Sequence, residues 1–181
     1  MKLEPRRLAG TYEIRFEPRG DERGYFMRWY DRDIFARAGL PTEWIQANES
    51  SSLRNVVRGL HFQRPPHAET KLVRAVAGRV FDVFVDLRRG SPTYGQSDSV
   101  ELSAERKNAV LIPRGFAHGF CALTDDAVVS YLVDNAYAPN AEGGLAWDDP
   151  ALGITWPVDA NPVVSARDRA WPRLADLEPI G

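Results

Sequence analysis

The residues best suited to chemistry lie in the segment Val57–Gln63, which reads Val-Arg-Gly-Leu-His-Phe-Gln, and at Lys71, ten residues after its histidine. His61 stands between apolar neighbours and close to Arg58. An imidazole can take up or release a proton near neutral pH, and an arginine and a lysine bind anions. Because Lys71 is within strand reach of His61, this combination predicts proton transfer on an anionic substrate.

The composition limits the other classes of function. The chain has 181 residues, of which 44% are hydrophobic, so we expect one domain over residues 1–181 with one sizeable core. Its 23 basic and 25 acidic residues give a net charge of -2 and are spread along the chain, so no nucleic-acid partner is expected. No apolar run approaches the ~18 residues of a membrane span, and the N-terminus does not read as a signal peptide. Cys121 is the only cysteine, which excludes an internal disulfide and fits a reducing cytoplasm.

Short strands separated by turns must position the chemical groups. One helix is expected from Asp31 to Gly39, with an acidic first turn and a glycine at its end. The breakers of Pro18–Gly24 predict a turn. Alternating or apolar runs predict strands at residues 11–16, 56–57, 72–76, 80–87, 98–102, 109–112, 119–123 and 128–133.

This spacing of strands indicates an all-β antiparallel sandwich or barrel rather than alternating strands and helices. We expect N-terminal strands within residues 8–30 and a barrel core over about 44–135. Residues 136–181 are rich in Trp and Pro and predict a loop-rich flap, with a short helix after Ser165.

The segment Ile112–Phe120 narrows the fold further. The spacing of its proline, glycine and His118 resembles the second motif of cupins, in which a turn directs a histidine into the barrel. Many cupins bind a metal there with two more histidines and a glutamate, but the only other histidines are His61 and His67. A mononuclear site needs three or four well-placed ligands. The sequence therefore predicts no metal site.

Further motifs follow in a fixed order along roughly residues 8–175. Together they resemble the dTDP-4-dehydrorhamnose 3,5-epimerase family, and a run of motifs this long is very specific. The motifs that carry the resemblance are Asp21–Phe26, Arg58–Gln63, Lys71–Arg74, Gly78–Arg88, Ser91–Gly95, Pro113–Phe120, Trp147–Pro150 and Ser165–Asp168.

The resemblance implies a double-stranded β-helix, a cupin-like jelly roll with a few short helices. It also implies a homodimeric epimerase without cofactor or metal, acting on a nucleotide-linked 4-keto-6-deoxyhexose. The expected reaction converts dTDP-4-dehydro-6-deoxyglucose to dTDP-4-dehydrorhamnose. A ketone at C4 acidifies the hydrogens on C3 and C5. Inversion at either carbon therefore needs a base on one face, charge stabilisation at the enolate oxygen, and an acid on the other face.

By the resemblance, His61 is the base, and Asp168 pairs with it to fix its tautomer and stabilise the imidazolium. Tyr131 matches the general acid, since a phenol titrates near pH ~10 and can donate a proton to a carbanion. Lys71 would stabilise the enolate. Taken singly, the four residues also fit a core histidine, a solvated helix-terminal aspartate, a core tyrosine and a strand lysine that reaches solvent.

The resemblance also implies substrate contacts. His118 matches a histidine that contacts substrate, Tyr137 an aromatic ring on which the base stacks, and Arg58 suits the diphosphate. Asp82 matches a carboxylate near the lysine and histidine of the family pocket, although a strand aspartate with a structural partner fits as well. The remaining expected contacts are Arg23, Arg28, Gln46, Asn48, Glu142 and Arg167.

Four positions depart from the family pattern. Arg28 stands where a glutamate that contacts the nucleotide is common, and Ala47, Glu69 and Arg167 replace an aspartate, a glutamine and a lysine. None of them is an expected acid or base, so only the nucleotide and the number of inverted carbons stay open. The alternatives are an epimerase that inverts one carbon of a related nucleotide-linked keto sugar, a metal-dependent cupin enzyme, and a non-catalytic sugar-nucleotide-binding module.

Overall fold

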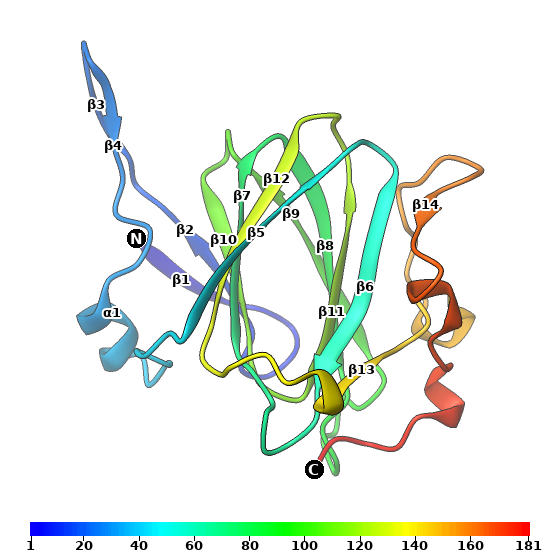
Figure 1. Cartoon of the computed structure of the whole chain (residues 1–181). Helices are drawn as coiled ribbons and strands as arrows, with labels where there is room; N and C mark the ends of the chain where they lie inside the picture. The colour runs from blue at the N-terminus through cyan, green and yellow to red at the C-terminus, as the bar shows by residue number, and fades with distance from the viewer.

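The computed structural model covers residues 1–181 and contains two facing β-sheets and one separate hairpin (Figure 1). The first sheet contains, in spatial order, β1 (Lys2–Pro5), β2 (Tyr12–Arg15), β10 (Asn108–Ile112), β7 (Lys71–Ala77), β12 (Ala127–Val133) and β5 (Gln46–Ser52). The second sheet contains β13 (Glu142–Gly144), β6 (Val56–Gln63), β11 (Phe116–Ala122), β8 (Arg79–Asp86) and β9 (Ser97–Ser103), with β14 (Val163–Val164) parallel to β6.

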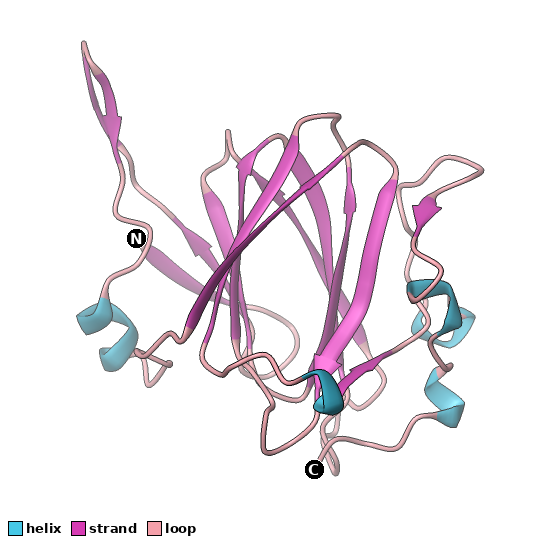
Figure 2. Ribbon diagram, viewed as in Figure 1, coloured by secondary structure: helices cyan, strands magenta, loops and turns pink.

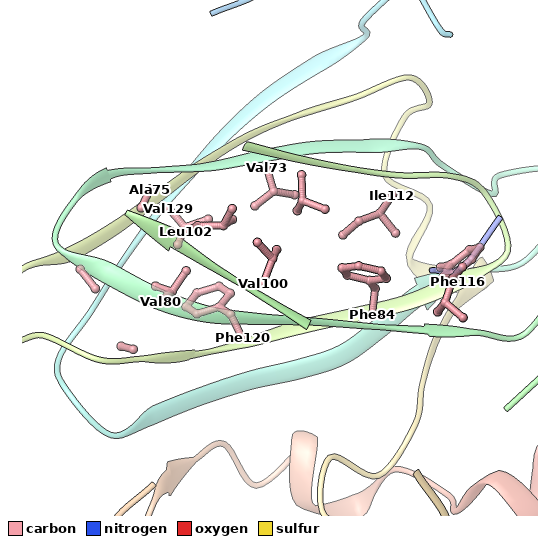
Figure 3. Packing of buried hydrophobic residues seen from close by; sticks show 14 residues of the cluster. Val73, Ala75, Val80, Phe84, Val100, Leu102, Ile112, Phe116, Phe120 and Val129 are labelled. Atoms are coloured by element: carbon pink, nitrogen blue, oxygen red, sulfur yellow. The ribbon is translucent and has the colours of Figure 1, made fainter. Parts of the chain in front are cut away.

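Alternation along these strands fills the space between the sheets with apolar side chains (Figure 3). Phe84 and Phe120 of the second sheet belong to the same buried cluster as Val73 and Val129 of the first. The two facing antiparallel sheets confirm the expected all-β, double-stranded β-helix of the cupin-like jelly-roll type.

The outer faces of both sheets are also covered. Leu60 and Val85 of the second sheet pack against Leu145 and Leu152 of the C-terminal segment. On the first sheet, outward side chains such as Leu72 pack around Phe35 of the only α-helix. Burial on both faces explains why so many strands read as continuous apolar runs.

The helices are short and lie outside the sheets (Figure 2). The expected helix is α1 (Arg32–Arg37), whose first turn is capped by the Asp31 side chain, which accepts from the N–H of Asp33 at 3.1 Å. None of the helices has the length and apolar character of a membrane span. Four 3-10 helices complete the chain: η1 (Pro139–Ala141), η2 (Pro150–Leu152), η3 (Asp168–Ala170) and η4 (Leu174–Asp176). The short helix expected after Ser165 is thus present as η3.

The structure corrects the strand prediction in three places. The segment expected as a turn at Pro18–Gly24 contains β3 (Arg19–Asp21), which pairs with β4 (Gly24–Phe26) in a hairpin that extends away from the sheets (Figure 1). β6 continues to Gln63, well beyond the expected end at Val57. β1, β5 and the short strands β13 and β14 were not predicted.

The strand β5 escaped prediction because its sequence, Gln-Ala-Asn-Glu-Ser-Ser-Ser, has no apolar alternation. Its pairing with β12 places Asn48 opposite Tyr131 and Ser50 opposite Val129, so these polar side chains share the inward face of the first sheet. Polar residues on an inward face indicate that this end of the sandwich is not filled by core.

Candidate active site

A cavity of about 580 Å³ lies between the two sheets at this polar edge. The first sheet contributes Lys71 and Tyr131 to its lining, and the second sheet contributes Arg58, His61 and His118. The C-terminal segment closes one side with residues that include Glu142, Ser165, Arg167 and Asp168. Residues more than a hundred positions apart in the sequence therefore meet around one space.

A β-bulge explains how Arg58 and His61 both face this cavity although three positions separate them. In the pairing of β6 with β11, His61 lies opposite His118 and Arg58 opposite Phe120, so β6 contains one extra residue. The bulge contains Gly59, whose φ of 123° suits glycine. A Cβ atom at Gly59 would lie 2.6 Å from the backbone of β11, so the two strands pack too closely for any side chain there.

His61 forms a short hydrogen bond with Asp168, with 2.6 Å between Nε2 and Oδ1. The other carboxylate oxygen, Oδ2, accepts from the Gly59 N–H at 3.2 Å, and the Trp171 indole N–H lies 3.3 Å from Oδ1. Burial alone would raise the pKa of Asp168, but the bonds from His61, Gly59 and Trp171 outweigh it and hold the pKa below its usual value.

The ionised state of Asp168 determines the tautomer of His61. A carboxylate only accepts hydrogen bonds, so Nε2 of a neutral His61 carries the proton and donates to Asp168. Nδ1 then has a free lone pair. Trp171 adds an edge-on contact with His61, with 6.3 Å between ring centroids. The arrangement holds the imidazole in the form that can remove a proton.

Tyr131 and Lys71 lie on the opposite wall. Tyr131 pairs with Val73 and Val133 pairs with Lys71, which makes the two functional side chains diagonal neighbours on one face of the first sheet. Burial raises the pKa of Tyr131, the charge of Glu69 raises it further, and Arg58 lowers it. Because the shift is upward from a value near 10, the phenol carries its proton at neutral pH.

A second histidine–carboxylate pair lies beside the first. His118 Nε2 lies 2.9 Å from Asp82 Oδ2, and Asp82 is completely buried, with no hydrogen-bond partner for its other oxygen. Burial raises the pKa of Asp82, while His118 and Lys71 act in the opposite direction. Asp82 thus has the lysine and histidine neighbours that the resemblance implies.

The rim of the cavity is a polar cluster around Glu142. This carboxylate accepts from the Tyr137 hydroxyl at 2.5 Å and lies 2.6 Å from an Arg167 nitrogen. The backbone N–H of Tyr137 donates to the Gln46 side chain at 2.9 Å. Arg58 is held at the mouth by Ser52, whose hydroxyl accepts from Nε at 2.9 Å. Two cations and an exposed aromatic ring therefore surround the entrance.

Two expected substrate contacts lie away from the cavity. Arg23 is at the tip of the β3–β4 hairpin, where its side chain is 83% exposed and pairs with Asp21. Arg28 follows the hairpin and lies 3.2 Å from Asp31. Neither lines the cavity of its own chain, whereas Asn48 lies on the inward face beside Tyr131.

Several residues at the site were not predicted. Ser50 and Ser165 line the cavity, and Ser165 accepts from the Asp168 N–H at 3.0 Å. Trp171 packs on Gly144, where an added Cβ would overlap the indole. Every residue from Gln46 to Ser52 except Ala47 is polar, so no alternation marked Ser50, and nothing local marked Trp171. No group of three or more His, Cys, Asp and Glu side chains gathers closely enough to hold a metal ion.

A histidine–aspartate pair faces a protonated phenol and an ammonium across the cavity, and this arrangement defines the class of protein. The protein has the groups of an acid–base isomerase built on a cupin-like jelly roll. The sequence pattern of dTDP-4-dehydrorhamnose 3,5-epimerases matches residues 5–176, and the chain belongs to this family.

Individual relatives agree with the family match. The chain is 46% identical to a dTDP-4-dehydrorhamnose 3,5-epimerase of Methanothermobacter thermautotrophicus, covering 93% of this chain and 92% of the relative. It is 44% identical to a dTDP-4-dehydrorhamnose 3-epimerase of Streptomyces niveus, covering 100% and 87%. A dTDP-6-deoxy-D-glucose-3,5-epimerase from Legionella pneumophila in complex with dTDP-4-keto-L-rhamnose superimposes with a TM-score of 0.93 at 36% identity, covering 98% and 94%.

Proposed function

We propose that the protein inverts C3 and C5 of a dTDP-linked 4-keto-6-deoxyhexose, converting dTDP-4-dehydro-6-deoxyglucose to dTDP-4-dehydrorhamnose. The observation that carries this proposal is the placement of the His61–Asp168 pair on one wall and Tyr131 with Lys71 on the other. A base and an acid on opposite walls suit a reaction that removes a proton from one face of a carbon and returns one to the other.

Each group then has one role. Nδ1 of His61 takes the proton from C3 or C5, and the electron pair of that C–H bond forms the enolate, whose charge rests on the C4 oxygen. The Lys71 ammonium stabilises this oxygen. The Tyr131 hydroxyl gives its proton to the carbon from the opposite face. The phenolate then regains a proton from solvent and the His61 imidazolium releases its proton to solvent, so both groups return to their starting states. Asp168 stabilises the imidazolium while the enolate exists.

The entrance fits the nucleotide end of the substrate. Arg58 and Arg167 offer guanidinium groups that bind diphosphate oxygens. Tyr137 is 54% exposed and offers a ring face for a base. The Legionella relative, which was solved with a dTDP-linked keto sugar, supports the same ligand class here. The proposed contacts also include His118, Asp82 and Asn48, together with Gln46 and Glu142 at the rim.

We also propose a homodimer in which the β3–β4 hairpin of one copy reaches the cavity of the other. Arg23 and Arg28, which the family resemblance assigns to substrate, lie outside the cavity of their own chain, and Tyr25 and Phe26 of the hairpin are 60% and 66% exposed. A mixture of His61→Ala and Arg23→Ala chains tests this arrangement. Mixed dimers would contain one complete site and regain activity that neither variant has alone. No regain would contradict shared sites.

An epimerase of C3 alone is the second candidate. The Streptomyces niveus relative, a 3-epimerase, is nearly as similar to this chain as the 3,5-epimerases. The acid and base are the same for one or two inversions, so the choice depends on how the sugar turns in the cavity.

One experiment separates these functions. The protein is incubated with dTDP-4-dehydro-6-deoxyglucose in deuterated water, and NMR locates the deuterium. Label at C3 and C5 together with the rhamno product supports the proposal, and label at C3 alone supports the second candidate. No label at either carbon would overturn both. We expect the same rate with and without a chelator, because the proposed steps use only side chains of the chain.

We propose a reducing cytoplasm as the compartment of this reaction. The only cysteine, Cys121, is buried and has no partner for a disulfide within the chain, which is usual for proteins of a reducing compartment.

A further inference from the structure

Glu69 is a carboxylate next to the cavity that has no role in the chemistry described above. It precedes β7, and its Oε1 lies 3.1 Å from the Lys71 ammonium. Both side chains are largely buried, with 13% of Glu69 and 12% of Lys71 exposed. A buried ion pair in this position is not a solvent-exposed surface contact, which would contribute little.

Glu69 also links the two walls. Its second oxygen, Oε2, lies 3.3 Å from the amide nitrogen of Gln63, which is the last residue of β6 in the second sheet. The same amide nitrogen donates to the backbone carbonyls of His67 at 2.9 Å and Ala136 at 3.2 Å, and the Gln63 carbonyl oxygen accepts from the Ala138 N–H at 2.6 Å. Gln63 therefore has a fixed orientation, and its two N–H hydrogens are shared among three acceptors, of which Glu69 is the most distant.

Tyr131 is a neighbour on which this charge acts. Around it, the first sheet presents Lys71, and the second sheet presents Arg58, His61, His118 and Asp82. The C-terminal segment adds Glu142, Arg167 and Asp168, each of which already has an oppositely charged or histidine partner. Burial is the largest cause of the raised pKa of Tyr131; the charge of Glu69 raises this pKa further and Arg58 lowers it.

We propose that Glu69 is a positioning residue for the epimerisation: its ion pair with Lys71 holds the ammonium in the cavity wall beside Tyr131 and keeps a negative charge at that wall. This inference rests on the proposed function for the meaning of the two groups. Lys71 can stabilise an enolate only if its ammonium stays at the wall.

A titration of Tyr131 tests the electrostatic part without any turnover. Tyrosine labelled with ¹³C at Cζ reports each phenol by NMR, and the Tyr131 signal is the one absent from Tyr131→Phe. We expect Glu69→Gln, which keeps the shape but removes the charge, to move this titration to lower pH. Glu69→Asp, which keeps a charge, should move it less. Glu49→Gln is the matched control, because Glu49 pairs opposite Ser130 on the outward face of β5 and is exposed.

Kinetics test the positioning part. Glu69→Gln should lower kcat about tenfold and change KM by less than about twofold, because the loss falls on the transition state and not on substrate binding. Glu69→Asp should restore part of kcat, and Glu49→Gln should behave as the wild type. An ion pair that only seals the end of the sandwich would alter thermal stability and leave kcat and KM unchanged.

The outcomes separate this inference from the proposed function. A Tyr131 titration that is the same in the wild type, Glu69→Gln and Glu49→Gln overturns the role of Glu69, even in an active epimerase. Absence of deuterium incorporation by the wild type overturns the proposed function, and a Tyr131 titration that still responds to Glu69→Gln would then support the electrostatic link on its own.

Discussion

The two walls of the cavity hold their functional groups in different ways. On the wall of the second sheet, His61 depends on Asp168, a residue 107 positions away that is itself fixed by Gly59 and Trp171. On the wall of the first sheet, Tyr131 and Lys71 are placed by the register of β12 and β7. The wall of the base is thus assembled from segments far apart in the sequence, whereas strand register alone places the groups on the wall of the acid. Substitutions on the two walls should therefore impair the reaction in different ways.

The largest effect is expected for His61→Ala, which removes the base. We expect C–H exchange at both carbons to fall by about a hundred- to ten-thousand-fold, measured as deuterium incorporation by NMR. Circular dichroism checks that the variant folds. A folded variant that keeps more than about a tenth of the wild-type rate would show that another group is the base.

Asp168→Asn should impair the same wall by changing the tautomer of His61. Oδ2 of Asp168 accepts from the Gly59 N–H, so an asparagine must keep its oxygen there and turn its NH₂ toward Nε2 of His61. That donor would favour the tautomer with the proton on Nδ1, where the base must be free. We expect exchange to fall on the order of a hundred-fold, mainly in kcat. If Asp168→Ala lost this much exchange and Asp168→Asn lost none, the aspartate would have a purely structural role.

Tyr131→Phe should distinguish the contribution of the base from that of the acid. With the base intact and no acid opposite it, exchange with solvent should persist while net inversion falls more than about tenfold. Both rates come from one experiment in deuterated water, with product and recovered substrate analysed together. Equal loss of exchange and inversion would count against the donor role of Tyr131.

The smallest effect on turnover is expected for Arg28→Glu, outside both walls. A guanidinium only donates hydrogen bonds and prefers carbonyl or phosphate oxygens, whereas a carboxylate accepts from a base or ribose donor. We expect the relative affinities for dTDP, UDP, GDP and CDP to change in calorimetry, while turnover of bound substrate stays within about threefold. An unchanged ranking would mean that Arg28 serves only its ion pair with Asp31.

The sequence predicted the wall of the acid better than the wall of the base. Apolar runs predicted the strand of Tyr131 and the strand that begins at Leu72, one residue after Lys71, because their other inward residues belong to the core. The same pattern ended β6 at Val57, because the bulge at Gly59 interrupts the period of two before His61. The pairing of Asp168 with His61 came only from the family resemblance, since no local pattern encodes a contact over 107 residues.

Other parts of the site had no sequence signal of the right kind. The polar strand β5 reads as a loop because its inward face lines a cavity. The hairpin at Arg19–Phe26 reads as a turn because its strands are short, exposed and rich in charges. Glu69 was visible as a departure from the family pattern, but no local pattern showed that its carboxylate would lie between Lys71 and Gln63 of the other sheet.

The distance between His61 and Asp168 along the chain also has a consequence for synthesis. A ribosome translates His61, Lys71 and Tyr131 well before it reaches Asp168 and Trp171. A chain that stops between Val133 and Asp168 contains the barrel strands and the acid but lacks the carboxylate that fixes the base. Premature termination there therefore yields a product without a complete proton-transfer site, and the capacity for chemistry arrives only with the last segment to be made.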